Sequence, residues 1–331
     1  MVYIYKKIIR KKPYYYLRAS QKKGKKLITK DIAYLGNNIE DVKKALDKLP
    51  DYKTEIRKAY RKITKFLDSN YYFEKAVSLK LKKDDYLDKK LLEIEAYKIH
   101  FNKTFKKLDE LTRKEIVKNF VIEFAYNTTS MEGNTIGLEE TRNLLEEGRT
   151  PKNKTLREIY DLKNHEKVFF EIFDFKKQIS HDFIIDIHSK LMSEIDKRIG
   201  YRTRDVRVFR SYFKSTPGKF VKTDIDLLLR WYDKNKEILH PFVLACIFHH
   251  KFEKIHPFMD GNGRTGRMLF NYILMRNNYP PVIVHKKTRT EYLEVLGKAD
   301  NSGLTQLDKK DYLGLVQYMA DEMIYYWDVF L

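Results

Sequence analysis

The sequence predicts a mainly α-helical protein with a small antiparallel β-meander at its N-terminus and a β-hairpin inserted into the helical part. Two observations predict this fold class. From residue 51 onward, apolar residues recur at intervals of three and four between Lys and Glu residues, which is the period of amphipathic helices. Before residue 51, short runs rich in Tyr and Ile are separated by turn residues, which is typical of short strands.

Three strands and one helix are expected at the start of the chain. The strands are residues 2–9, 13–19 and 25–34. Gly36 and the two asparagines after it supply a stop and an N-cap for a helix over about residues 39–49, which Pro50 ends.

The helical pattern that follows has one interruption. Residues 205–222 alternate around Pro217-Gly218, which predicts a β-hairpin within the helical part. We therefore expect three regions: a basic β-rich module at residues 1–50, a helical connecting region at 51–114 and a helical domain at 115–331.

Positive charge is concentrated at the N-terminus. The net charge is +20, and residues 1–30 hold eleven Lys or Arg and no Asp or Glu. Such a face would attract nucleic acid, a nucleotide, an acidic protein or anionic lipid. The alternative is a solvated Lys-rich surface of the kind found in thermophile proteins.

Composition excludes several classes of protein. Cys246 is the single cysteine, so neither an intrachain disulfide nor a thiolate zinc cluster can form. No apolar run reaches the length of a transmembrane helix, and the basic start MVYIYKKIIRKK lacks the apolar stretch of a signal peptide. We expect a cytoplasmic protein that does not bind to a membrane.

A glycine-rich loop between two helical patterns carries the strongest functional signal. Residues 256–267 read HPFMDGNGRTGR. Pro257 disfavours continuation of the preceding helix, and a new helix is expected from Arg264. Gly261 and Gly263 let the loop backbone approach a ligand closely. Because a helix N-terminus presents free N–H groups, the loop favours an anion, above all phosphate.

Four side chains of this loop suit chemistry on a phosphate group. Arg264 and Arg267 lie three residues apart on one helix face, and guanidinium groups match phosphate oxygens. The carboxylate of Asp260 would be repelled by phosphates unless a divalent cation such as Mg²⁺ lay between them. His256 is the titratable group near the site that can accept a proton around neutral pH. The loop therefore predicts attack on a phosphorus atom of a nucleotide.

The tripeptide His-Pro-Phe also occurs earlier, at residues 240–242. An apolar helix start follows it, without glycine, carboxylate or arginine. We expect His240 to have a structural role near a helix N-terminus, with Pro241 in the first turn.

Residues 256–267 resemble the signature of the Fic domain family, His-Pro-Phe-x-(Asp/Glu)-Gly-Asn-Gly-Arg-x-x-Arg, and every fixed position is matched. The likeness runs over roughly residues 115–325 and includes Ala245, His249, residues 279–281, Arg289 and Tyr292. The resemblance implies a Fic-type helical bundle with the signature between two central helices. It also implies transfer of AMP from ATP to a hydroxyl group of a target protein.

The resemblance implies roles for residues of the loop. His256 would be the base that deprotonates the target hydroxyl. Asp260 would hold Mg²⁺ on the α and β phosphates. Asn262, with the N–H groups of Gly261 and Gly263, would steady the α-phosphate.

The resemblance also implies roles for the two signature arginines, for Tyr292 and for the predicted hairpin. Arg264 and Arg267 would hold the β and γ phosphates, and Tyr292 would contact the nucleotide. The predicted hairpin would be the family's flap, in which Val206 and Val208 align a target segment by strand addition.

A second stretch, TTSMEG, begins at Thr128. Thr128 and Glu132 are four residues apart, so they share a face of the helix expected over about residues 118–133, and Gly133 is a natural C-cap. Taken alone, this is a capped surface helix. It resembles the inhibitory motif Ser/Thr-x-x-x-Glu-Gly/Asn of many Fic proteins. In those proteins the Glu pairs with the second signature arginine, here Arg267, and the γ-phosphate cannot bind productively.

We therefore expect an autoinhibited protein adenylyltransferase that uses ATP and Mg²⁺ and also modifies itself. Two alternatives stay open. In one, Glu132 orients a water and the same pocket removes AMP from a modified protein, with His256 as the acid. In the other, residues 1–30 bind nucleic acid and the pocket senses a nucleotide. The sequence does not name the target protein or choose among its Ser, Thr and Tyr hydroxyls, and it leaves a homodimer open.

Overall fold

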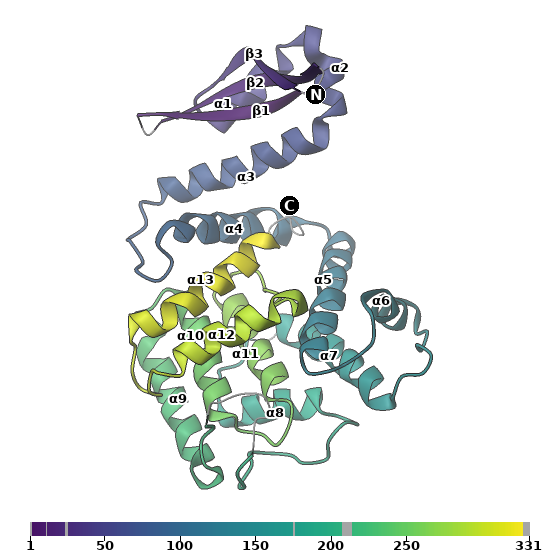
Figure 1. Ribbon diagram of the computed structural model, residues 1–331, viewed down its shortest axis with the longest axis vertical. Helices are drawn as coiled ribbons and strands as arrows, with labels where there is room; N and C mark the ends of the chain where they lie inside the picture. Colours follow the sequence, from purple (N-terminus) through teal and green to yellow (C-terminus); the bar gives the residue numbers. More distant parts are fainter. Residues whose placement is uncertain (1, 11, 24–25, 175, 207–213, 327–331) are drawn as a thin grey trace. The chain divides into compact units, whose positions relative to one another are not determined.

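The computed structural model describes residues 2–10, 12–23, 26–174, 176–206 and 214–326 (Figure 1). The chain divides into two compact units, formed by residues 1–82 with 95–100 and by residues 83–94 with 101–330. Within the described ranges, no helix combines the length and hydropathy needed to cross a membrane. The predicted fold class, mainly helical with a small N-terminal sheet, is confirmed.

The first unit contains the predicted three-stranded meander. Its antiparallel strands β1 (Val2–Ile9), β2 (Lys12–Lys23) and β3 (Lys26–Gly36) lie side by side in that order. The helix predicted after them is α1 (Ile39–Asp47), and its N-cap Asn38 accepts a hydrogen bond from the Asp41 N–H at 2.9 Å.

One face of this sheet is buried against helices. The helices α2 (Lys53–Lys58) and α3 (Tyr60–Ser78) follow α1. Together the strands and helices enclose a core made by Val2, Ile4, Tyr15, Leu17, Leu35, Ile39, Val42, Ala59, Ile63 and Leu67. Alternate residues of a strand point to opposite faces, so the residues between these core positions face away from the core.

The second unit is a bundle of helices. Helix α4 (Leu91–Lys103) belongs to both units, since its residues 95–100 are part of the first unit and its two ends are part of the second. The other described helices of the second unit are α5 (Glu110–Met131), α6 (Leu138–Glu147), α7 (Leu156–Asp174), α8 (His181–Leu191), α9 (Val221–Asn235), α10 (Pro241–Ile255), α11 (Asn262–Arg276), α12 (Arg289–Ala299) and α13 (Lys309–Tyr325). The central pair is α10 and α11, which pack on each other (Figure 1). Helices α5, α7 and α8 pack on α11, and α9 and α13 pack on α10. The glycine-rich loop joins the two central helices, as the resemblance implies.

The predicted β-hairpin at residues 205–222 is wrong at its C-terminal end. Residues Gly218–Phe220 form a 3-10 turn and α9 begins at Val221. The described residues 205–206 and 214–217 contain no strand, and residues 207–213, with Val208, lie outside the described ranges. Val206 is partly buried.

Local contacts explain why the residues after Gly218 form a helix and not the second strand of the predicted hairpin. A Cβ atom at Gly218 would lie 2.5 Å from the backbone of Thr203, so this glycine permits a close approach of two segments. The Gly218 N–H donates to Asp205 Oδ1 at 2.7 Å. Beyond it, Val221, Ile225 and Leu228 bury one face at helical spacing.

Candidate active site

His256 lies at the C-terminal end of α10. Its backbone is in the left-handed region, with φ 53° and ψ 61°, and its N–H donates to the Phe252 carbonyl at 3.0 Å. A non-glycine residue adopts this conformation at a cost of about 1 kcal/mol or more, so surrounding contacts must hold it there. The backbone turn directs the chain away from α10 and begins the loop.

Arg202 supplies those contacts. Its guanidinium donates from Nε to the His256 carbonyl at 2.7 Å and from Nη2 to the Ile255 carbonyl at 3.2 Å. It also donates to the carbonyls of Arg204 and Thr216, which flank the undescribed part of the predicted flap. The Arg202 side chain is buried and is fixed at both ends of its fork. Sequence reasoning missed it, because the carbonyls that it holds at the end of α10 lie 53 and 54 residues away.

Phe258 and Asn262 brace the loop from inside. Phe258 is fully buried, and its N–H and carbonyl both bond to the Asn262 side-chain amide, at 2.8 and 2.9 Å. The ring of His188 stacks on Phe258 with centroids 3.6 Å apart, and its Nε2 lies 3.0 Å from the Asp260 carbonyl. The amide of Asn262 is therefore engaged by the loop backbone, and His188 is a supporting residue that the sequence did not reveal.

Two glycines allow the close packing around the loop. Gly261 has φ 78°, and a Cβ atom there would lie 2.6 Å from the sulfur of Met192. A Cβ atom at Gly263 would lie 2.3 Å from Glu132 Oε1 and 2.9 Å from Arg267 Nη1. The Glu132 carboxylate can approach the first turn of α11 because residue 263 is glycine, since any side chain there would collide with it.

Arg264 is held between two carboxylates. Its Nη1 donates to Asp161 Oδ1 at 2.7 Å, and its Nη2 donates to Asp260 Oδ1 at 2.9 Å. Its enclosed Nε has no hydrogen-bond partner among the described residues. Asp161, on α7, was not predicted, since its distance of 103 positions from Arg264 leaves no signal in the sequence.

Asp260 has a second arginine partner. Arg157 Nη2 donates to Asp260 Oδ2, and the Gly261 N–H donates to Oδ1 at 2.6 Å. Burial acts to raise the pKa of the Asp260 carboxyl, but the Arg264 charge and these hydrogen bonds outweigh it and the pKa is lowered. Asp260 is therefore ionised at neutral pH, as a Mg²⁺ ligand must be.

Arg267 is joined to the helix that precedes Glu132. Its Nε donates to Thr128 Oγ1 at 2.7 Å, and its Nη2 donates to the Thr128 carbonyl at 3.0 Å and to Glu132 Oε1 at 2.7 Å. Helix α5 ends at Met131, and Gly133 has φ 104°. Partial desolvation of the half-exposed carboxyl acts to raise the pKa of Glu132, but the Arg267 charge lowers it below the ordinary value. The ion pair that the resemblance implies is thus present.

The ring of His256 is held in its neutral form by its surroundings. Burial is the main cause that lowers its pKa to about 4, and the nearby Arg202 charge lowers it further. The imidazole is therefore neutral at neutral pH. A neutral imidazole at the start of the loop is the protonation state that a general base needs.

Glu253 is a further buried carboxyl that sequence reasoning missed. It lies one turn before His256 on α10, and its enclosed Oε1 has no hydrogen-bond partner in the described part of the chain. A Cβ atom at Gly266 would lie 2.3 Å from this oxygen. Burial raises the pKa of Glu253 to about 8, although the Arg267 charge acts in the opposite direction.

Two other predicted residues lie outside the loop. Tyr292 is buried on α12, and its hydroxyl lies 2.6 Å from His249 Nε2, so it lines the helical wall around Arg267. His240 is the N-cap of α10, where its Nδ1 accepts from the Phe242 N–H at 3.3 Å and its Nε2 lies 3.2 Å from the Tyr279 hydroxyl. The position predicted for His240, at a helix N-terminus with Pro241 in the first turn, is confirmed.

The donor set allows only one kind of metal site. Among the described residues there is no group of three or more His, Cys, Asp or Glu side chains placed to hold a metal ion. Within residues 256–267, Asp260 is the residue that would offer a carboxylate. This fits Mg²⁺ that takes its other ligands from phosphates and water, because Mg²⁺ commonly binds through one or two carboxylates plus substrate oxygens.

Comparison with known proteins agrees with this geometry. Residues 178–274 match the Fic/DOC family. The chain is 33% identical over 183 residues to the protein adenylyltransferase fic-1 of Caenorhabditis elegans, covering 54% of this chain and 36% of that protein. It is 31% identical over 199 residues to the protein adenylyltransferase Fic of Nematostella vectensis, covering 59% of this chain and 47% of that protein. The chain thus spans less than half the length of these two relatives.

Solved structures with the same fold include two Fic proteins. A Fic-domain-containing signalling protein from Bacteroides thetaiotaomicron has a TM-score of 0.65 and 27% identity, covering 71% of this chain and 95% of that chain. Fic-1 from C. elegans has a TM-score of 0.60 and 24% identity, covering 88% of this chain and 82% of that chain. The residues that match the Fic/DOC family contain the loop, α10 and α11 up to Leu274, so the similarity to this family lies on the helices and loop that form the site.

Proposed function

We propose that this protein is an adenylyltransferase that moves AMP from ATP to a hydroxyl group of a target protein and to itself. The observation that carries the proposal is the arrangement at the loop. A neutral histidine lies at one end, and a helix N-terminus flanked by the buried side chains of Arg264 and Arg267 lies at the other. The curated relatives named protein adenylyltransferase support the same activity.

In this reaction His256 accepts the proton of the target hydroxyl. The hydroxyl oxygen forms a bond to the α-phosphorus, and the bond from that phosphorus to the bridging oxygen of the β-phosphate breaks. Pyrophosphate leaves with the bonding electron pair, and His256 releases its proton to water. Base catalysis of this type contributes roughly a hundred- to ten-thousandfold to a rate.

The phosphate chain needs cationic partners. The N–H groups in the first turn of α11 and the guanidinium groups of Arg264 and Arg267 supply them, because all lie on the loop side of α11. Asp260 would hold Mg²⁺ against the phosphates. When bound, the metal ion would neutralise the charge that develops on the leaving pyrophosphate.

Glu132 is proposed to inhibit the reaction. It occupies Arg267, and a carboxylate and a γ-phosphate compete for the same guanidinium. Thr128 strengthens the block, because two further hydrogen bonds fasten Arg267 to α5. The segment that contains Val206 and Val208 is proposed to align the target chain.

Transfer of label from α-labelled ATP in the presence of Mg²⁺ tests the proposal without knowledge of the target. The Glu132→Gly variant should label itself, and Glu132→Gly combined with His256→Ala should not. Equal labelling of both variants would contradict the role of His256, and absence of labelling in both would contradict the transferase activity.

A further inference from the structure

The two faces of the N-terminal sheet differ in character. Val2 and Ile4 of β1 and Tyr15 and Leu17 of β2 are buried in the core of the first unit. The alternate residues of these strands point to the opposite face, which we call the outer face. Helices α1 and α3 pack on the inner face of the sheet, where they share a core with the buried strand residues. None of the core residues described for the first unit covers the outer face.

A row of tyrosines crosses the outer face. Tyr5 pairs with Tyr16 across β1 and β2, and Tyr16 pairs with Tyr34 across β2 and β3, so the three occupy one line over all three strands. The rings of Tyr16 and Tyr34 have centroids 5.4 Å apart, and that of Tyr14 lies 6.3 Å from Tyr34. Tyr34 is 54% exposed. These rings form a platform that is partly open to solvent.

Cations surround this platform. The guanidinium of Arg18 lies 3.6 Å from the ring centroid of Tyr5 and also pairs with Asp31 at 2.5 Å. Lys7 is exposed and pairs with Tyr14 in the sheet register. Lys12 and Lys22 are exposed and alternate with the core positions of β2, so they share the outer face, and Arg10 is exposed in the turn between β1 and β2. With eleven Lys or Arg and no acidic residue in residues 1–30, this part of the chain attracts anionic partners.

We propose that the outer face of the N-terminal sheet binds single-stranded nucleic acid. Bases stack on the tyrosine rings, and the surrounding lysines contact phosphates. Stacking platforms ringed by positive charge are the physical basis of sequence-tolerant single-strand binding. A single strand fits better than a duplex, because only unpaired bases expose their faces to the rings. This site is separate from the adenylyl-transfer loop and does not depend on the function proposed for it.

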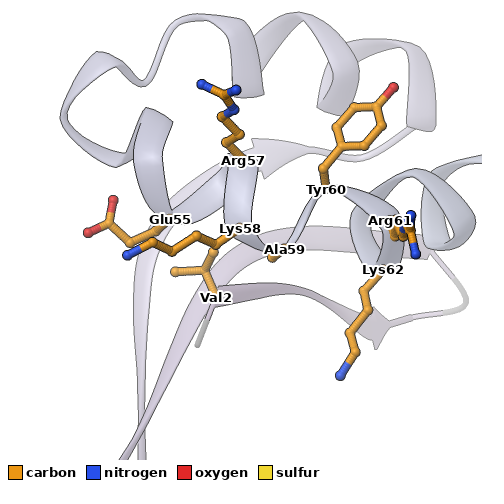
Figure 2. A pocket seen from close by; sticks show the side chains of 8 residues that line it. All are labelled: Val2, Glu55, Arg57, Lys58, Ala59, Tyr60, Arg61 and Lys62. Atoms are coloured by element: carbon orange, nitrogen blue, oxygen red, sulfur yellow. The ribbon is translucent and has the colours of Figure 1, made fainter.

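A second basic region of the same unit offers a matched control. A hollow of about 990 Å³ at the junction of α2 and α3 is lined by Val2, Glu55, Arg57, Lys58, Ala59, Tyr60, Arg61 and Lys62. Figure 2 shows that the charged ends of Arg57, Lys58 and Lys62 point in different directions, so they do not converge on one anion. Tyr60 is 63% exposed and, unlike Tyr16 and Tyr34, it packs on no other aromatic ring among the described residues.

Fluorescence anisotropy of the full chain with a labelled oligothymidylate and with a labelled duplex of the same length tests the proposal. The wild-type protein should bind the single strand more tightly than the duplex, and binding should weaken as salt increases. Tyr34→Ala should weaken single-strand binding roughly fivefold or more, because base–aromatic stacking contributes about 1–3 kcal/mol per base. Tyr34→Phe should keep the affinity, since the ring remains.

The control substitutions distinguish binding at the outer face from nonspecific attraction by the positive charge of the first unit. Tyr60→Ala removes an equally exposed tyrosine and should leave binding unchanged. Lys7→Gln with Lys12→Gln should weaken binding more than Lys58→Gln with Lys62→Gln, although each pair removes two charges. His256→Ala should bind the oligonucleotide as the wild type does.

Three outcomes would overturn the proposal. They are no binding of the oligothymidylate at low salt, preference for the duplex, and equal losses in the Tyr34→Ala and Tyr60→Ala variants. Binding to phosphatidylserine vesicles without oligonucleotide binding would assign the outer face to a membrane surface instead. Thermal unfolding of each variant shows whether it is folded, and the exposed position of Tyr34 makes its replacement compatible with folding.

Discussion

Arg267 donates from Nη2 to Glu132 Oε1 at 2.7 Å, which joins two residues 135 positions apart in the sequence. The guanidinium is buried, whereas the Glu132 side chain is 39% exposed. A competitor that arrives from solvent therefore meets the carboxylate first and can displace it without unfolding α11. In the proposed function, this asymmetry would make the pair a reversible block on the cation that our account assigns to a phosphate.

Replacement of each histidine of the two His-Pro-Phe tripeptides should have different effects. His256→Ala should lower transfer roughly a hundred- to ten-thousandfold, because it removes the base, while nucleotide binding is kept. His240→Ala should leave transfer nearly unchanged and lower the melting temperature, because it removes the N-cap of α10. Labelling assays and nucleotide titrations on both variants, in the Glu132→Gly background, measure these effects. Equal losses of transfer would show that the distinction between the tripeptides is wrong.

Asp260→Ala should weaken Mg²⁺-dependent nucleotide binding. The variant loses the carboxylate that belongs to the loop sequence and also a partner of Arg264 and Arg157. Titration of a fluorescent ATP analogue with and without Mg²⁺ separates the two effects, because only loss of the metal site removes the response to Mg²⁺. Asp161→Asn is the matched control, since it removes the other carboxylate partner of Arg264 and leaves Asp260 in place. Full turnover of the Glu132→Gly protein in excess chelator would contradict the role of Asp260.

Arg202→Lys should lower the transfer rate roughly tenfold or more, with a smaller effect on the apparent affinity for ATP. Lysine carries three N–H donors on one nitrogen, so it cannot replace the four bonds that Arg202 makes from three separate nitrogens, and the strained backbone of His256 loses support. Arg204→Lys serves as the control, because the Arg204 side chain is exposed. Rates and affinities that match those of the wild type would mean that the loop holds its conformation without Arg202.

Glu253 should make stability depend on pH. Burial raises its folded pKa from 4.5 to about 8, so the folded protein holds this proton more tightly than the unfolded chain does. The stabilisation is complete below pH 4.5 and is lost as the pH rises to about 8. Glu253→Gln keeps a neutral side chain, so the variant should lose less stability across this window, by on the order of a few kcal/mol, since each pKa unit corresponds to about 1.4 kcal/mol. Denaturant unfolding of both proteins below, within and above the window checks this, and parallel curves would contradict it.

The sequence predicted those features that have local causes. Runs of Tyr and Ile gave the three strands, Asn38 and its neighbours gave the start of α1, and Pro257 with Gly261 gave the break between α10 and α11. The pair of Glu132 and Arg267 followed from a family resemblance and not from spacing in this chain.

The features that were missed have distant causes. Arg202, Asp161, His188 and Glu253 act through contacts that form only when separate helices pack, and no periodic pattern marks them. The hairpin prediction failed over residues 218–222, because Gly218 serves a close contact with Thr203 and is not the turn of a hairpin.

The central claim is that Glu132 restrains a transferase by occupying Arg267. The most direct measurement is the incorporation of label from α-labelled ATP by the wild type, Glu132→Gly and Glu132→Gly with Arg267→Ala. If the charge-assisted contact contributes about 1.5–3 kcal/mol, Glu132→Gly should label itself roughly ten- to hundredfold faster than the wild type. The double variant should be inactive, because the guanidinium that binds phosphate is lost. Removal of AMP from the labelled protein, followed on the same samples, separates the reverse activity, which Glu132→Gly would abolish. Unchanged labelling in Glu132→Gly, with unchanged removal of AMP, would contradict the account and leave Glu132 as a structural partner of Arg267 alone.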